Sequence, residues 1–325
     1  MNTKKFIKEN ILTRKIYSIY KDSQKKRARH QRLNYHGIFV DRSKKENKLC
    51  IVLAGYKEFL YDAVFGRLIK YLDDDIDVCI ITSGKWSDNI ASICKKNNWS
   101  YLSTKENDVS LVQNVAINLH PNAKYIFKLD EDIFITKDYF KKMFLALEDA
   151  KKSLYNPGVI APIIPINGYG YCRVLSKLDL EKEYIKRFGR IKCSTTTKDA
   201  ILSDPTVAKF FWGEGQIVPS IDYMNDKFSN EPIKEYACPI RFSIGAILFE
   251  RSLWEEMDGF RVVKGTNSLG VDEADMCNFC CFTSRPLMVS ENIVVGHLSF
   301  GPQNSEMKKY FQKNIKLFMP ENENV

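Results

Sequence analysis

The sequence lacks any long hydrophobic run. No stretch of its 325 residues reaches the roughly 18 uninterrupted apolar residues that a membrane span needs. The first residues contain no apolar segment before a small-residue cleavage site, so a secretory leader is not expected either. Internal repeats and low-complexity segments are also missing. With 44% hydrophobic and 12% aromatic residues, the composition excludes a wholly disordered or collagen-like chain and indicates a globular protein.

The body of the chain has little positive charge of its own. The whole sequence carries 49 Lys and Arg against 40 Asp and Glu, a net charge of +9. Residues 1–48 hold 15 of the basic and 4 of the acidic residues, or +11, so residues 49–325 sum to −2. A nucleic-acid-binding body is therefore not expected, because such domains carry a basic face on the fold itself.

The basic N-terminal arm, residues 1–48, has three interpretations. Its apolar residues, among them Phe6, Ile11 and Tyr17, spread around most of a helical wheel, so the amphipathic signal is poor. A solvated, partly disordered extension is the simplest interpretation. Binding to an anionic membrane surface is the second, since each Lys or Arg near such a surface contributes about 1 kcal/mol. Nucleic acid is the third and is not expected as a partner, because no recognisable module is present.

The nine cysteines are an odd number and do not form an evident disulfide framework. Several lie within apolar runs such as Val78–Ile80, where a free thiol behaves as a small hydrophobic residue. Free thiols are typical of a reducing compartment, so a cytoplasmic location is expected. The cluster Cys277, Cys280 and Cys281 would need a second ligand pair to bind structural zinc, and buried thiols on a helix are the preferred interpretation.

Short apolar runs alternate with segments of helical spacing from Leu49 onward. Residues 49–54 and 76–81 are expected to be buried strands, and apolar residues at helical spacing follow the first of them. A third run, residues 125–129, leads directly into an acidic segment. This alternation predicts an α/β fold with a largely parallel sheet and helices on both faces. Residues 165–238, rich in proline and aromatic residues, break the rhythm and predict an irregular insertion whose aromatic side chains stack on a ligand.

The acidic segment consists of three consecutive carboxylates, Asp130, Glu131 and Asp132, between apolar strand residues. Like charges repel one another and resist burial unless a cation compensates them. The carboxyl end of a strand is where ligands bind in open α/β sheets. Hard oxygen ligands at that place would hold Mg²⁺ or Mn²⁺, which could bridge the phosphates of a nucleotide. The alternative is a solvated acidic turn.

Two later segments contain further candidate residues. Asp272 and Glu273 lie where a helix is expected to begin. Carboxylates in a first turn favour the helix dipole, and this is the structural alternative to a role as general base. His297, one of only four histidines, directly follows an apolar strand. A lone histidine is more often structural, but beside a metal-binding aspartate it is a candidate ligand.

In their order and context, these segments resemble nucleotide-sugar-dependent glycosyltransferases of the GT-A fold, particularly the family 2-like bacterial polysaccharide glycosyltransferases. The similarity runs from Leu49 to about Ser299. Residues 129–132 resemble the family's DxD motif, and residues 242–251 resemble the strand and helix that precede its catalytic acid pair. Asp272–Asp275 stands where that pair is expected. The resemblance implies a Rossmann-like, mostly parallel central sheet flanked by helices, with an irregular acceptor-side insertion.

The resemblance also implies a role for each candidate residue. Asp132 and His297 would ligate Mn²⁺ or Mg²⁺, and Asp130 would contact the ribose or the metal. Glu273 or Asp272 would take the proton of the acceptor hydroxyl. Residues expected to contact the nucleotide sugar lie at the ends of early strands and on the helix before the acidic segment, namely Gly55, Tyr56, Ser83 and Asn114.

Two positions depart from the family pattern. Many relatives have Arg where Gln113 stands, so one phosphate or nucleoside contact is missing or is supplied elsewhere. The acid pair reads Asp-Glu rather than Glu-Asp, which leaves the assignment of the base open between Asp272 and Glu273.

The expected activity is transfer of a sugar from a nucleotide-diphosphate sugar, with a UDP-sugar favoured, to a hydroxyl of a glycan or lipid-linked glycan. The reaction is expected to invert the anomeric centre and to serve bacterial surface polysaccharide synthesis. The alternatives are a nucleotidyltransferase on a similar sheet and a non-catalytic protein that binds carbohydrate or membrane. The expected organisation is a basic arm (1–48), a GT-A domain (49–315) and a C-terminal tail (316–325), the domain dividing into a nucleotide-sugar-binding half (49–164), an insertion (165–240) and an acceptor and catalytic half (241–315).

Overall fold

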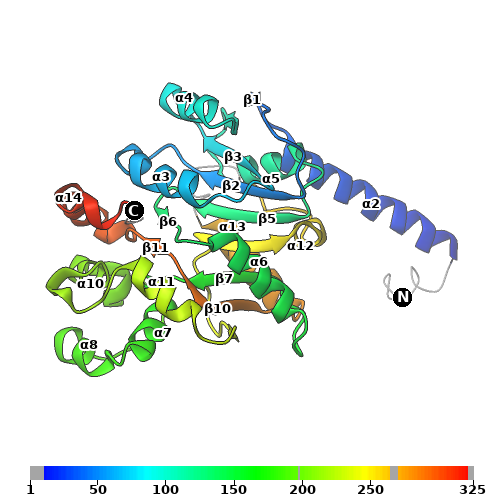
Figure 1. Cartoon of the computed structure of the whole chain (residues 1–325). Helices are drawn as coiled ribbons and strands as arrows, with labels where there is room; N and C mark the ends of the chain where they lie inside the picture. Colours follow the sequence, from blue (N-terminus) through cyan, green and yellow to red (C-terminus); the bar gives the residue numbers. More distant parts are fainter. Residues whose placement is uncertain (1–10, 197, 264–269, 321–325) are drawn as a thin grey trace.

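The computed structural model describes residues 11–196, 198–263 and 270–320. Its centre is a nine-stranded sheet in the order β1-β4-β3-β2-β5-β9-β7-β10-β8 (Figure 1). Six strands run in one direction, and β1, β8 and β9 run in the other. The strands are β1 (Gly37–Val40), β2 (Lys48–Leu53), β3 (Ile76–Ser83), β4 (Ser100–Thr104), β5 (Tyr125–Asp130), β7 (Val159–Ile163), β8 (Glu235–Ala237), β9 (Ala246–Glu250) and β10 (Leu287–Val294).

Helices flank this sheet, so the predicted α/β class with a mostly parallel central sheet is confirmed (Figure 1). The central strands are buried on both faces: all eight residues of β3 are buried, as are Leu49–Val52 of β2. Continuous apolar strands of this kind are typical of parallel sheets covered by helices. The principal helices of the body are α3 (Tyr61–Tyr71), α4 (Asp88–Lys96), α5 (Val109–Leu119), α6 (Tyr139–Ala150), α12 (Arg251–Glu256), α13 (Val271–Phe282) and α14 (Asn304–Lys313).

The described part of the basic arm consists of a helix and an edge strand, and residues 1–10 of the predicted arm lie outside the described residues. Helix α2 (Ile11–Leu33) extends away from the sheet, and β1 pairs with β4 as an antiparallel edge strand (Figure 1). The Arg32 guanidinium donates to the carbonyl oxygens of Met257, Asp258 and Gly259 and so fixes the end of α2 to the end of α12. Within the described ranges, no helix has the length and apolar character needed to cross a bilayer.

The insertion is more helical than its sequence predicted. It contains α7 (Gly170–Lys177), α8 (Glu181–Phe188), α9 (Ala200–Ser203), α10 (Pro205–Phe211) and α11 (Ile221–Ser229). Most of its aromatic side chains are buried against one another, and the ring of Tyr184 lies 6.1 Å from that of Phe211. The expectation that these aromatic residues stack on a ligand is therefore wrong for most of them, because they form the core of the insertion.

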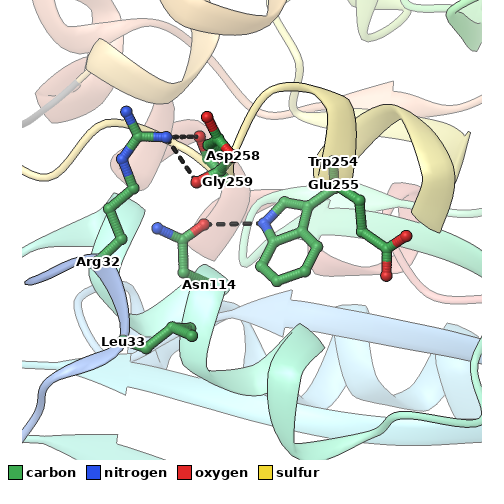
Figure 2. Close-up of a pocket in the computed structure, with 7 residues that line it drawn as sticks. All are labelled: Arg32, Leu33, Asn114, Trp254, Glu255, Asp258 and Gly259. Atoms are coloured by element: carbon green, nitrogen blue, oxygen red, sulfur yellow. Dashed lines mark hydrogen bonds between the residues drawn. The ribbon is translucent and has the colours of Figure 1, made fainter. Parts of the chain in front are cut away.

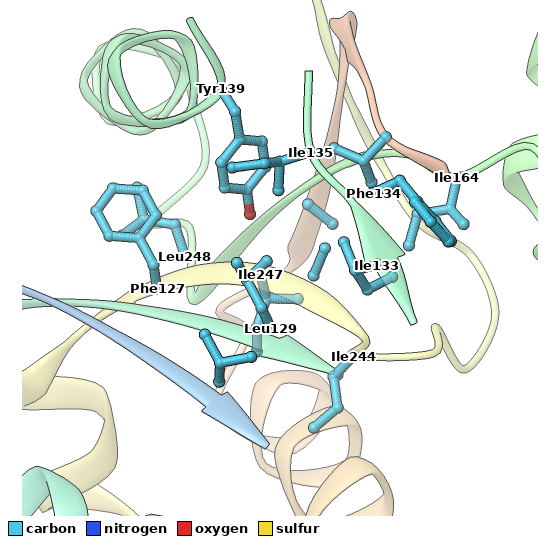
Figure 3. Close-up of a cluster of buried hydrophobic side chains, with 14 of the residues drawn as sticks. Phe127, Leu129, Ile133, Phe134, Ile135, Tyr139, Ile164, Ile244, Ile247 and Leu248 are labelled. Carbon is cyan, nitrogen blue, oxygen red and sulfur yellow. The ribbon is translucent and has the colours of Figure 1, made fainter. Parts of the chain in front are cut away.

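A second, two-stranded sheet joins the insertion side to the acidic segment. Strand β6 (Ile133–Phe134) pairs antiparallel with β11 (Gly296–His297), and His297 lies opposite Ile133. Trp212 packs over Gly296, where an added Cβ would lie 2.4 Å from the indole. The buried side chains beneath this junction include Leu129, Ile133 and Phe134 (Figure 3). Their packing supports the residues at the end of β5 from below.

All nine cysteines lie in described segments and are free thiols. On α13, Cys277 is half-buried with its Sγ 3.5 Å from the Phe242 carbonyl oxygen, whereas Cys280 is buried and Cys281 is exposed. The three thiols of this cluster thus have different surroundings, as expected for side chains spaced around a helix.

Candidate active site

The carboxyl ends of β2, β3 and β5 meet at one edge of the sheet. In the parallel register, Leu53 pairs with both Ile81 and Asp130, so the three strands end side by side. The loop after β2, the end of β3 and the acidic segment after β5 therefore lie next to one another. The carboxyl ends of parallel strands are the usual position of a ligand site in open α/β sheets.

Glu131, the middle residue of the acidic segment, holds the loop after β2. Its buried carboxylate accepts hydrogen bonds from the backbone N–H groups of Gly55 at 2.8 Å and Tyr56 at 2.9 Å. Burial raises the pKa of the Glu131 carboxyl, although these amides stabilise its charged form. Gly55 has a φ of +122°, in the left-handed region that favours glycine. Glu131 is thus a structural member of the acidic segment.

Asp132 is buried between two basic side chains. His297 Nε2 lies 3.2 Å from Asp132 Oδ2, and the Lys57 ammonium contacts the same oxygen. Burial would raise the pKa of Asp132, but His297 and Lys57 hold it below its ordinary range. The pKa of Lys57 is raised, because the attraction of Asp132 outweighs the effect of burial. Asp132 is therefore a carboxylate and Lys57 an ammonium at neutral pH.

Asp130 pairs with a lysine from its own strand. Lys128 is buried, and its Nζ lies 2.5 Å from Asp130 Oδ1 and 2.9 Å from the Ile244 carbonyl oxygen. Burial raises the pKa of Asp130, and the nearby Asp132 and Asp272 carboxylates add to the increase, against the effect of Lys128. The two residues lie on the same face of β5 because side chains two positions apart in a strand point the same way.

Asp272 and Glu273 begin α13 close to this cluster. Asp272 is buried and accepts a hydrogen bond of 2.9 Å from Gln113 Nε2. Glu273 Oε1 lies 2.8 Å from Arg241 Nε. Burial raises the pKa of Glu273 to about 7, and the nearby Asp272 carboxylate adds to the increase. A carboxyl group whose pKa lies near neutrality can exchange a proton during a reaction.

Lys128 links the two acidic groups electrostatically. Burial would lower its pKa, but Asp130 on its own strand and Asp272 and Glu273 on α13 together raise it. All three carboxylates thus raise the pKa of one buried ammonium. Asp130, which pairs with Lys128, and the predicted catalytic pair therefore lie near the same buried lysine.

Tyr56, in the loop after β2, contacts Ser83 at the end of β3. The Tyr56 hydroxyl lies 2.8 Å from the Ser83 carbonyl oxygen and 3.1 Å from Asn107 Oδ1. The Tyr56 side chain is 58% exposed, with Lys85 Nζ 5.0 Å from its ring centroid. An exposed ring fixed by its hydroxyl offers a flat surface on which a base could stack.

Asn114 has different surroundings from the other predicted nucleotide-binding residues. Its side chain is fully buried, and Oδ1 accepts from Trp254 Nε1 at 2.9 Å and from the Phe260 N–H at 2.8 Å. Its Nδ2 donates to the Phe260 carbonyl oxygen at 2.7 Å. Figure 2 shows Asn114 between Arg32 and Trp254, next to the loop residues Asp258 and Gly259 that follow α12. Within the described segments, these bonds give Asn114 a structural position; its predicted role in binding the nucleotide is still a prediction.

Four residues of the site were not predicted as such from the sequence. Gln113 was noted only as a departure from the family pattern, and it fixes Asp272 instead. A signal for Lys128 was available, because a lysine two positions before an aspartate in an apolar strand needs a buried partner. Lys57 and Arg241 reach the site from loops, and no local pattern indicates their partners. The residues added by the structure are Lys57, Gln113, Lys128 and Arg241.

The donor atoms of the site fit a divalent cation that is shared with a ligand. Asp132 offers a carboxylate oxygen and His297 an imidazole nitrogen, while His297 Nδ1 lies 3.4 Å from the Ile166 carbonyl oxygen. A backbone partner at the second ring nitrogen is typical of metal-binding histidines. No group of three or more candidate protein ligands is found in the described parts of the chain. Mg²⁺ needs no such group, because it is commonly bound through one or two carboxylates, phosphates and water.

No protein-family model matches the chain, and a search of curated proteins gave no match. Among solved structures, the chain is similar to mannosyltransferase PcManGT from Pyrobaculum calidifontis in complex with GDP-Man and Mn²⁺. The identity is 13%, the coverage is 90% of this chain and 71% of that chain, and the TM-score is 0.48.

The chain is also similar to S. aureus TarS 1-349. In one structure the identity is 10%, with 80% of this chain and 63% of that chain covered and a TM-score of 0.43. In the complex with UDP-GlcNAc the identity is 11%, the coverages are 79% and 61%, and the TM-score is 0.44. The chain thus spans less than two thirds of these TarS chains. At such identities and TM-scores similarity does not establish an activity, so the function is argued from the site.

Proposed function

We propose that the chain is a glycosyltransferase that moves a sugar from a nucleotide-diphosphate sugar, preferably a UDP-sugar, to a hydroxyl of a glycan or lipid-linked glycan. The observation that carries this proposal is that Asp130 pairs with buried Lys128 at the carboxyl edge of the sheet, while Asp272 and Glu273 lie near enough to raise the pKa of the same ammonium. Sugar transfer needs one group to bind the cation of the diphosphate and another to activate the acceptor. Asp130 and Asp132 supply the first, and Asp272 and Glu273 supply the second.

Asp132 and His297 would hold Mn²⁺ or Mg²⁺, with Asp130 beside them. The bound ion would act as a Lewis acid toward the departing diphosphate. The exposed ring of Tyr56 would contact the nucleoside, and Gly55 and Ser83 would shape the pocket around it. These three residues lie at the ends of β2 and β3, beside the acidic segment.

Glu273 is our preferred general base. Its carboxyl has a pKa of about 7, so a substantial fraction is ionised at neutral pH and can accept the proton of the acceptor hydroxyl. The acceptor oxygen would then bond to the anomeric carbon as the bond from that carbon to the diphosphate oxygen breaks on the opposite side. A single displacement of this kind inverts the anomeric centre. Asp272, held by Gln113, would keep the first turn of α13 in place.

A nucleotidyltransferase receives less support from the same loop. Such an enzyme would use free backbone amides after the first strand to cradle phosphates. In this chain the amides of Gly55 and Tyr56 donate to Glu131. Phosphate binding by these amides would require displacement of a buried carboxylate.

The experiment that tests the proposed function uses a panel of UDP-, GDP- and CMP-sugars, with and without Mn²⁺. We expect metal-dependent binding and slow hydrolysis of one donor, both of which the substitution Asp132→Ala abolishes. Exposed Asp88 provides a matched control, and Asp88→Ala should behave as the wild type. Absence of metal-dependent donor binding, together with no effect of Asp132→Ala, would refute the proposal.

The proposed location is the cytoplasmic face of the cell membrane, in bacterial surface polysaccharide synthesis. Helix α2 supports membrane association because it exposes large apolar side chains among its many cations. Ile16 is 60% exposed and Ile19 is 61% exposed. A basic helix that presents apolar residues to solvent is suited to an anionic lipid surface.

A further inference from the structure

The acidic segment already carries a cation at the place proposed for the metal. The Lys57 ammonium contacts Asp132 Oδ2, the same oxygen that lies 3.2 Å from His297 Nε2. Asp132 is buried, and Lys57 is also largely buried, with 23% of its side chain exposed. The ion pair is therefore only weakly screened by water.

The position of Lys57 is fixed by its backbone. Glu131 accepts hydrogen bonds from the two residues that precede Lys57, Gly55 and Tyr56. Lys57 is the N-cap of the 3-10 helix η1 (Glu58–Leu60), and its carbonyl oxygen accepts a hydrogen bond of 2.9 Å from the N–H of Leu60, the last residue of that helix. Glu131, the middle residue of the acidic segment, thus holds the loop after β2. That loop places Lys57 against Asp132, the last residue of the segment.

This arrangement makes Lys57 a competitor of the metal. A buried carboxylate needs a partner of opposite charge, and Lys57 provides it with His297 nearby. A divalent ion bound by Asp132 and His297 would use the oxygen that the ammonium now contacts. Both cations cannot occupy that position, and two adjacent positive charges would repel each other.

We propose that Lys57 occupies Asp132 in the free protein and exchanges its position with the divalent cation when a nucleotide diphosphate binds. This inference rests on the proposed function. A metal that arrives alone must displace Lys57 and leave the ammonium without a partner. A metal that arrives with a diphosphate provides phosphate oxygens to which the ammonium can move. Metal and nucleotide diphosphate therefore bind with positive coupling, and Lys57 is the residue that couples them.

The test measures Mn²⁺ binding to the full chain without nucleotide, from the electron paramagnetic resonance signal of free Mn²⁺. We expect Lys57→Met to bind Mn²⁺ about tenfold or more tightly than the wild type, since close charge pairs have coupling energies of that order. Lys85→Met is the matched control. It removes an ammonium that lies over the ring of Tyr56, and it should leave the Mn²⁺ affinity unchanged. Lys57→Gln, which keeps a hydrogen-bond donor, gives the same comparison if the methionine variant folds poorly.

A second measurement uses UDP as the probe. At saturating Mn²⁺, Lys57→Met should bind UDP about tenfold more weakly than the wild type, because the diphosphate loses one cationic partner. The coupling between Mn²⁺ and UDP, taken from the two affinities measured separately and together, should fall accordingly. Equal Mn²⁺ affinity in the wild type and in both Lys57 variants would overturn the inference.

Failure of the inference can be told apart from failure of the proposed function through Asp132→Ala. If this variant loses Mn²⁺ while the Lys57 variants bind it as the wild type does, the metal site stands and the exchange is wrong. If Mn²⁺ binds equally to the wild type and Asp132→Ala, the metal assignment in the proposed function is wrong, and the exchange at Asp132 fails with it. In that case, UDP binding that persists without Mn²⁺ would show that the proposed nucleotide site is correct although the metal assignment is wrong.

Discussion

Each carboxylate of the acidic segment has partners of its own. Asp130 pairs with Lys128, Glu131 accepts from the backbone of the loop after β2, and Asp132 lies between Lys57 and His297. Because each carboxylate has separate partners, three adjacent negative charges can lie at one strand end with each charge neutralised or hydrogen-bonded. Only the outer two are then available to a cation, while the middle one fixes the loop.

The first prediction at the residue scale concerns Glu273. Because burial raises its pKa to about 7, the carboxyl is mostly protonated below that pH and cannot act as a base. The transfer rate should therefore rise with pH through an apparent pKa near 7 and level off above it. Glu273→Gln should lower kcat by about 10²–10⁴-fold and remove this pH dependence. Asp272→Asn is the neighbouring control, and a larger loss there would assign the base to Asp272.

The raised pKa of Glu273 also has a consequence for stability. The folded protein holds the proton up to a higher pH than the unfolded chain, whose glutamate has an ordinary pKa of 4.5. The contribution of this group to stability is therefore present below pH 4.5 and is lost as the pH rises toward 7. At pH 8, Glu273→Gln should unfold at the same denaturant concentration as the wild type or at a higher one. A lower midpoint would indicate a structural role through Arg241.

The second prediction at this scale concerns Gln113. Its Nε2 is the hydrogen-bond donor to buried Asp272, and its Oε1 has no hydrogen-bond partner among the described residues. Gln113→Ala should lower the free energy of unfolding by about 1–3 kcal/mol, because the Asp272 carboxylate loses a donor without regaining water. Denaturant unfolding monitored by tryptophan fluorescence measures this change. A variant as stable as the wild type would show that Asp272 finds another donor.

At the scale of elements, one long-range connection builds the site and a second joins α3 to the insertion and to the C-terminal segment. The pairing of β6 with β11 brings His297 beside Asp132 across 165 positions of the sequence. A buried ion pair joins Arg67 on α3 to Asp222 on α11, with N–O distances of 2.7 and 2.8 Å. Arg67 also donates to the carbonyl oxygens of Phe318 and Met319, and Phe318 is fully buried. The start of the predicted C-terminal tail is thus packed into the domain.

The prediction at the element scale concerns this ion pair. Arg67→Met should lower the free energy of unfolding by about 3–5 kcal/mol, because it leaves Asp222 as an unpaired buried charge. Lys45→Met, which breaks an exposed pair with Asp41, is the control and should change stability by less than about 1 kcal/mol. Denaturant midpoints of the two variants check the difference. Equal effects would mean that water or another cation compensates Asp222.

At the scale of the whole molecule, the charge divides between an arm and a body. The arm carries +11, and the remainder sums to −2. The structure attaches the arm to the body at Arg32 and at β1, while α2 extends outward with Ile16, Ile19 and Tyr20 exposed. The C-terminal end of α2 is therefore held beside α5 and the end of α12.

The prediction at this scale is binding to anionic vesicles. The full chain should sediment with phosphatidylglycerol vesicles and remain in solution with phosphatidylcholine vesicles, and binding should weaken as salt rises because the attraction is screened. The double substitution Ile16→Ser and Ile19→Ser should reduce the bound fraction at a given salt concentration. Ile69 on α3 is also exposed, so Ile69→Ser makes the same substitution away from α2 and serves as the control. Equal binding to both lipids would refute an electrostatic association.

The sequence determined those features that depend on local patterns. The apolar runs at residues 49–54, 76–81 and 125–129 were sufficient to predict buried parallel strands, because a strand covered by helices on both faces is apolar along most of its length. The position of Asp130 and Asp132 after an apolar strand was sufficient to predict a ligand site there, and the resemblance to a known family implied that Gly55 and Ser83 contribute to it. Asp272, Glu273 and His297 were candidates from their own positions, and the resemblance to a known family added a role for each of them.

Only the tertiary structure decided which charges meet. Lys57 and Gln113 take partners that are 75 and 159 positions away in the sequence, respectively, and no local period encodes such contacts. The composition of the insertion is compatible both with aromatic residues on a surface and with aromatic residues in a core. The structure shows that most of them pack in a core. The sequence by itself thus determined where the carboxylates lie, and the fold determined which cations neutralise them, because that choice depends on distances between segments that only folding brings together.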